Sequence, residues 1–219
     1  MKNIALVFVL IMTGLVLPAC KFHGHGISGS GVRKSEKRDL KPFKAIDTTG
    51  AYKIDVTCQK TSSFEIEADD NLLPLIKTDV LDGILVVSSD QRINASKPVV
   101  LRVSLPELSS VTSRGAGEIK ITDAAGDSLK IESTGAASVY ANGKVKTVTI
   151  SSTGAGEVDT TNLKAEKATV EVKGAANIDT YATEQLDVTV AGAGSVTYSG
   201  NPKVVHKSVS GFGSVNKKE

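Results

Sequence analysis

A glycine-rich pentapeptide recurs in the second half of the chain, and this repeat constrains the fold more than any other feature. Its six copies start 20, 19, 20, 18 and 19 residues apart, at Gly115, Gly135, Gly154, Gly174, Gly192 and Gly211. A period near 19 residues with strand-like alternation is typical of a solenoid in which each repeat forms one coil. The sequence therefore predicts an all-β chain, a single-domain parallel β-helix of about 19 residues per coil.

Two apolar columns appear when the copies are aligned on their first glycine. Four residues after it stand Ile119, Val139, Val158, Ile178, Val196 and Val215, and four residues before it stand Val111, Ile131, Ile150, Val170, Val188 and Lys207. Stacked in successive coils, these columns would form the core, and the lysine in the last copy suits a terminal coil with a polar end. We favour a right-handed path, because parallel crossovers nearly always take that hand.

Residues 42–110 are less regular, and we interpret them as N-terminal coils or a cap before the repeat coils of 111–216. Apolar residues alternate at Tyr52, Ile54 and Val56, as in half-buried strands. The acidic run before Leu72 and the early Pro74 predict a capped helical turn that closes one end of the solenoid. Residues 217–219 would be a charged tail.

The first residues have the layout of a signal peptide, with Lys2, a short apolar run and then Leu17-Pro18-Ala19-Cys20. This ending resembles a lipobox, in which the cysteine becomes the lipid-bearing first residue of the mature chain. We therefore expect a signal peptide over 1–19, acylation of Cys20 and attachment to a bilayer, with the outer membrane favoured. A plain secretory peptide that leaves Cys20 free is the alternative. The Gly, Ser, His and charged residues of 20–41 predict a flexible tether.

Composition argues against several kinds of site. A net charge of +2 without a basic stripe gives no reason to expect nucleic acid binding. Cys58 is the only cysteine besides Cys20, so no internal disulfide can form once Cys20 is acylated, and its strand pattern predicts a buried small hydrophobe. His23 and His25 lack further ligands, and the glycines at 24, 26 and 29 lack the strand and helix of a dinucleotide-binding turn. We expect no cofactor.

Several short motifs together resemble one known family over about residues 42–216. They are the run Asp69-Asp70-Asn71-Leu72-Leu73-Pro74, the turn Asp82-Gly83, the step Leu105-Pro106-x-Leu108, the Gly-Ala-Gly repeats and the ending Tyr198-Ser199-Gly200-Asn201-Pro202. The pattern resembles the head GIN domain family of putative auto-transporter adhesins. This resemblance implies a parallel β-helix, common among lipoproteins of Gram-negative bacteria, with a role in adhesion and no established catalytic residues.

We weigh two kinds of function. The favoured one is a non-catalytic envelope module for binding, adhesion or assembly, whose partner would be an envelope protein or a glycan. The alternative is a polysaccharide-acting or calcium-binding protein that uses the outward carboxylates Glu157, Asp159 and Asp179, beside Glu118 of the same column. Asp159 and Asp179 fall on adjacent coils, where two carboxylates could act as acid and base or hold a hard cation. Because no nucleophile, base or metal cluster accompanies them, we expect no enzyme activity and assign no catalytic residue or metal ligand.

Overall fold

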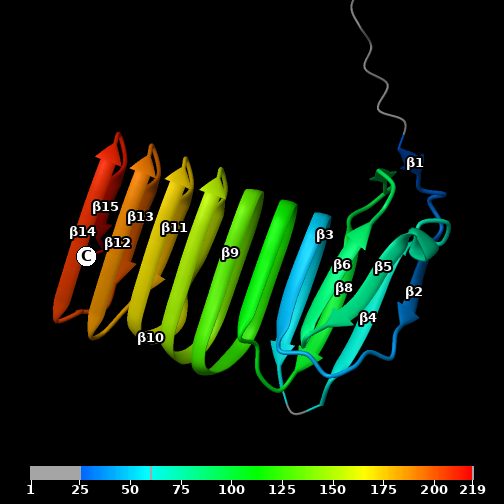
Figure 1. Cartoon of the computed structure of the whole chain (residues 1–219), viewed down its shortest axis with the longest axis horizontal. Coiled ribbons are helices and arrows are strands. Elements are labelled where there is room, and N and C mark those ends of the chain that lie inside the picture. The colour runs from blue at the N-terminus through cyan, green and yellow to red at the C-terminus, as the bar shows by residue number, and fades with distance from the viewer. Residues whose placement is uncertain (1–25, 60, 219) are drawn as a thin grey trace, which may run out of the picture.

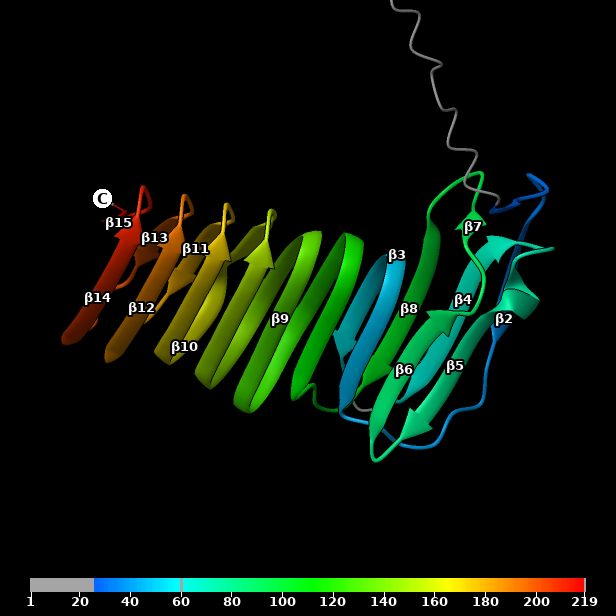
Figure 2. The same ribbon diagram turned by 45° about the horizontal axis from the view of Figure 1, so that its top comes forward.

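The computed structural model describes residues 26–59 and 61–218, and this part of the chain is all-β, with 74% of the residues in strands. The strands lie side by side along the longest axis of the molecule (Figures 1 and 2). The predicted signal peptide, Cys20, His23 and His25 lie outside the described residues. Within them, no helix is long and apolar enough to cross a membrane.

The repeats form a stack of coils whose strands pair in parallel and in register. These strands are β9 (Ser110–Gly154), β10 (Glu157–Gly174), β11 (Asn177–Tyr181), β12 (Gln185–Gly192), β13 (Ser195–Ser199), β14 (Val204–Gly211) and β15 (Ser214–Lys217). Gly154, Gly174, Gly192 and Gly211 are successive register partners. The predicted alignment of the copies is therefore confirmed.

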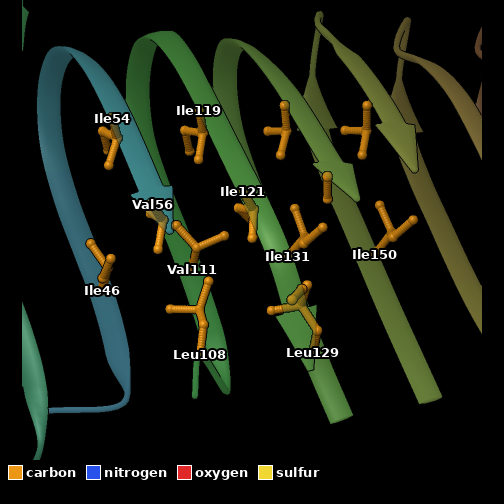
Figure 3. Close-up of a cluster of buried hydrophobic side chains, with 14 of the residues drawn as sticks. Ile46, Ile54, Val56, Leu108, Val111, Ile119, Ile121, Leu129, Ile131 and Ile150 are labelled. Atoms are coloured by element: carbon orange, nitrogen blue, oxygen red, sulfur yellow. The ribbon is translucent and has the colours of Figure 1, made fainter. Parts of the chain in front are cut away.

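Both predicted apolar columns lie in the core. Val139, Val158, Ile178 and Val196 are successive partners and are almost fully buried, and the column ends at the half-buried Val215. The second column buries Val111, Ile131, Ile150, Val170 and Val188, and ends at the exposed Lys207. Figure 3 shows how isoleucine and valine side chains of successive coils line up inside the stack. Each such side chain contributes about 1.5–3 kcal/mol by leaving water.

The first glycine of each copy is required by the close approach of one coil to the next. At Gly135, for example, φ is +125°, and a Cβ would lie 2.2 Å from the carbonyl oxygen of Gly115. Only glycine combines this backbone conformation with the absence of a side chain. The corners therefore present bare backbone and small side chains along one edge of the stack.

The N-terminal half departs from the predicted run of parallel coils. Here β3 (Ala45–Cys58) pairs in parallel with β6 (Ile84–Ser89), β8 (Val99–Leu105) and β9. In contrast, β4 (Ser63–Asp69) pairs antiparallel with β8, and β5 (Ile76–Leu81) pairs antiparallel with β6. The sheet is thus mixed, and the prediction of parallel pairing throughout 42–216 is wrong for this half. The turn Asp82-Gly83 explains the β5–β6 hairpin, because positive φ values of 50° and 77° reverse the chain in two residues.

Residues 26–41 are part of the fold, and the expectation of a flexible tether is wrong for them. β1 (Ile27–Ser28) pairs with β7 (Ile93–Asn94), and β2 (Arg33–Lys37) pairs antiparallel with β4. The side chain of Arg38 donates to the carbonyl oxygens of Leu73 and Ile76, at 3.0 and 2.7 Å. Backbone pairing and arginine bonds therefore order a segment whose composition lacks apolar periodicity.

Candidate functional site

The described part of the chain contains a cavity of about 1090 Å³ where the N-terminal strands meet the coil stack, which we name the junction groove. Its inner wall is formed by the corners of β3 and β9, and its outer wall by the segment 89–99, which includes β7. The lining residues are Thr49, Gly50, Ala51, Tyr52, Lys53, Ser89, Asp90, Gln91, Arg92, Ile93, Ala95, Ser96, Lys97, Pro98, Val99, Ala116, Gly117, Glu118, Ser138 and Tyr140.

The inner wall includes several small residues, among them Gly50, Ala116 and Gly117. Gly117 has a φ of +140°, and a Cβ there would lie 2.0 Å from the carbonyl oxygen of Tyr52, so no larger residue fits. The ring of Tyr52 is buried, whereas Tyr140, also in the lining of the groove, is 38% exposed. Mostly apolar walls with a few polar groups are usual in ligand-binding clefts.

The outer wall is held in place by one buried carboxylate, Asp69, at the end of β4. Its oxygens accept hydrogen bonds from the backbone N–H of Ser96 at 2.9 Å and of Gly31 at 3.0 Å, and from the hydroxyl of Ser96. These bonds, those from Ser96 first, hold the pKa of Asp69 below its ordinary value. We name this arrangement the Asp69 clasp. The sequence predicted that the acidic run would cap a helical turn. The turn is present as the short 3₁₀ helix η1 (Leu73–Leu75), but its N-cap residue is Leu72, which makes no side-chain hydrogen bond, so Asp69 forms the clasp and not a helix cap.

The N-terminal segment also supports this wall. The guanidinium of Arg33 donates to the carbonyl oxygens of Pro98 at 2.9 Å and Lys97 at 3.4 Å, and β1 pairs with β7. Residues expected to form a tether therefore help to hold the outer wall of the groove in place. Sequence reasoning missed them because each bond joins segments 27 to 65 residues apart.

Two cations in the groove have no salt-bridge partner among the described residues, Arg92 and Lys97 of the exposed outer wall. The other charges are paired: Lys53 with Glu118 at 3.0 Å, and Asp90 with Lys77. Glu118 raises the pKa of Lys53 through a hydrogen bond and its negative charge. The unpaired charge of the groove is therefore positive and confined to one wall, which favours a ligand with an anionic group.

The predicted acidic column is present on adjacent strands. Asp159 and Asp179 are register partners, as predicted, and Glu157 lies two residues before Asp159 on β10. However, Asp159 accepts a hydrogen bond from the backbone N–H of Thr161 at 2.9 Å. Among the described residues, no three His, Cys, Asp or Glu side chains gather where they could hold a metal ion. Glu118 of the same column also lines the junction groove, where it pairs with Lys53.

A histidine and an aspartate pair on the last two coils. Nδ1 of His206 lies 2.7 Å from Oδ1 of Asp187, a register partner that also accepts from Gln185 at 2.7 Å. Sequence reasoning missed this pair, although alignment of the last two coils places both residues in one column.

Cys58 is half-buried, and burial raises the pKa of its thiol, in accord with a packed residue rather than a reactive one.

A family comparison identifies the relatives of this architecture. The family described as "Putative auto-transporter adhesin, head GIN domain" matches residues 42–202. The chain belongs to the head GIN domain family. The match spans β3 to β13, and therefore includes both walls of the junction groove. No curated protein matches the chain.

Solved structures from two bacterial genera share the fold. A putative adhesin from Bacteroides fragilis has 24% identity and a TM-score of 0.70, covering 88% of this chain and 100% of its own. A putative adhesin from Parabacteroides distasonis has 17% identity and a TM-score of 0.64, covering 88% of this chain and 99% of its own. A protein of that bacterium described as a putative lipid binding protein has 18% identity, a TM-score of 0.53 and the same two coverages. At these identities the likeness concerns the fold alone.

Proposed function

We propose that this chain is a non-catalytic binding module of the cell envelope, and that the junction groove is its ligand site. The observation that carries the proposal is a groove of about 1090 Å³ with apolar walls, an exposed tyrosine and two unpaired cations on one side. Membership of an adhesin family suggests a surface protein without catalytic activity, in agreement with this assignment. The ligand would be an anionic glycan or an acidic segment of an envelope protein.

We further propose that Cys20 is acylated and holds the protein to the outer membrane, and that its coils form a right-handed parallel β-helix. β1 would begin close to the anchor, because seven residues from Cys20 to Ile27 can extend at most about 25 Å. Since β1 pairs with β7, the junction groove would then lie at the membrane-proximal end. The stack of coils would extend away from that end, as its layout along the long axis suggests (Figure 1).

The experiment is ligand binding by full-length protein that carries Cys20→Ala, applied to an array of acidic and neutral glycans and envelope-derived peptides. We expect acidic ligands to bind, and the double change Arg92→Glu with Lys97→Glu to weaken binding about 100-fold, since two charge pairs would become repulsive. Lys144→Glu with Lys167→Glu is the matched control, because both lysines are exposed on the coils away from the groove. Equal losses in the two double variants would assign binding to overall charge and exclude the groove.

A further inference from the structure

We propose that the free side of the last coil binds an extended acidic strand from another protein, which adds to the sheet as one more rung. This terminal edge consists of β14 and β15, at the end of the coil stack (Figures 1 and 2). The junction groove lies elsewhere, where the N-terminal strands meet the stack. The terminal edge is a second interaction surface, independent of the groove and of any membrane anchor.

The backbone of the terminal edge offers a row of hydrogen-bonding groups. The N–H groups of Val204 and Phe212 donate inward, to the carbonyl oxygens of Glu184 at 3.0 Å and Gly192 at 2.9 Å. Because strand residues alternate in the side to which their N–H points, those of Val205, Lys207 and Val209 point outward. Among the residues described, no strand pairs with β14 or β15 on that side. The edge therefore matches the backbone of an extended strand.

The side chains at this edge are unusually apolar for an exposed strand. Phe212 is 98% exposed at a corner where the five preceding copies carry alanine. Val209 and Val204 are 45% and 44% exposed, and Val209 continues the buried column of Val190. An added strand would cover these groups, and their burial would favour its association.

Charge indicates the chemistry of that strand. Residues 203–218 contain four lysines and no aspartate or glutamate. Lys207 takes the core-column place of Val188 in the preceding coil, and its Nζ donates to the carbonyl oxygen of Val215 at 3.2 Å. An acidic residue opposite Lys207 would gain a cross-strand ion pair, and a basic one would be repelled.

Two other occupants fit less well. If a second copy paired symmetrically with this edge, the two Lys207 side chains would lie close together between the two cores. Two like charges in that position would destabilise the dimer. Contact with a bilayer would leave the outward N–H groups without acceptors in hydrocarbon. At the opposite end, the exposed edge strand β2 carries charges of both signs, Lys34, Glu36 and Lys37, which discourage strand addition.

The test uses two synthetic peptides with the sequence of Gln185–Gly192, a strand that already pairs with β14, one carrying Val188→Glu and the other Val188→Lys. Binding to full-length protein with Cys20→Ala is measured by fluorescence anisotropy. We expect the glutamate peptide to bind about tenfold more tightly, and Lys207→Glu in the protein to reverse this order. Val209→Pro removes one outward N–H without breaking an inward bond and should abolish binding, whereas Val209→Ala should weaken it only a few fold.

Three results would overturn the proposal. The first is equal affinity for the two peptides, and the second is unchanged binding by Val209→Pro when its melting temperature is normal. The third is occupation of the edge by something else. Sedimentation showing a dimer that Val209→Pro dissolves would assign the edge to a second copy, and Phe212-dependent binding to phosphatidylglycerol vesicles would assign it to a membrane.

Discussion

The buried carboxylate of Asp69 accepts hydrogen bonds from both the backbone N–H and the hydroxyl of Ser96, and thereby joins the end of β4 to the wall of the junction groove. A third bond, from the N–H of Gly31, adds the N-terminal segment to the same carboxylate. The shape of the groove therefore depends on one ionised group that the groove itself does not contain.

This clasp should make the outer wall sensitive to acid. The pKa of Asp69 is lowered from an ordinary value of 3.8, so its stabilisation is complete above that value and is lost as pH falls through the lowered pKa of the folded state. Hydrogen exchange should therefore show that residues 26–33 and 93–98 lose protection below about pH 4, whereas the coils lose protection only at lower pH. Asp69→Asn should give the same loss at neutral pH. Equal protection of wild type and variant would show that the clasp is not needed.

The stacked core predicts that position along the coils determines the cost of a buried charge. Val158→Asp in a central coil would bury an unpaired carboxylate and cost several kcal/mol, whereas Val215→Asp in the half-buried last coil should cost much less. Thermal unfolding of the two variants measures this difference. Equal falls in melting temperature would contradict a stack that ends at β15.

The glycine corner of the groove should not accept alanine. At Gly117 the new Cβ would meet the carbonyl oxygen of Tyr52, so Gly117→Ala should lower the free energy of unfolding by more than about 2 kcal/mol. Gly83→Ala is the control: its φ is also positive, at +77°, but no atom lies within 4 Å of the added Cβ. It should cost only about 1 kcal/mol. Similar costs in urea unfolding would mean that backbone strain, not close stacking, requires glycine.

Anchoring through Cys20 is tested directly by metabolic labelling with a fatty acid. Cys20→Ala should abolish the label and release mature protein from the membrane fraction, because without acyl chains the chain has no strong hold on the bilayer. Retention of the unlabelled variant in that fraction would contradict the proposed anchor.

The acidic column should be dispensable if the protein is a binding module. The triple change Glu157→Gln, Asp159→Asn and Asp179→Asn should alter the melting temperature by less than about 2 °C. Glu157 is exposed and the two aspartates are half-buried, and asparagine at 159 keeps an oxygen that can accept from the N–H of Thr161. Calcium should raise the melting temperature of neither protein. A calcium effect confined to wild type, or failure of a folded variant to complement a deletion strain, would favour the acidic-site alternative.

The regular half of this fold could be predicted from sequence because each coil repeats the same environment. Val139 and Val158 are 19 residues apart, and their alignment identified the core column without further information. The N-terminal half offers no repeat, and its antiparallel strands depend on single features such as the Asp82-Gly83 turn. The groove was harder still to predict, because bonds such as those from Arg33 to Pro98 and from Ser96 to Asp69 join distant segments.

The glycine corners have an evolutionary consequence. Since Gly154, Gly174 and Gly192 are register partners, a duplicated segment that runs from one corner to the next would enter the stack as a complete unit. Each duplication would lengthen the molecule by about 4.8 Å and leave both of its ends intact. If Cys20 anchors the protein as proposed, a lineage could thus change how far the terminal edge stands from the membrane without altering either end of the molecule.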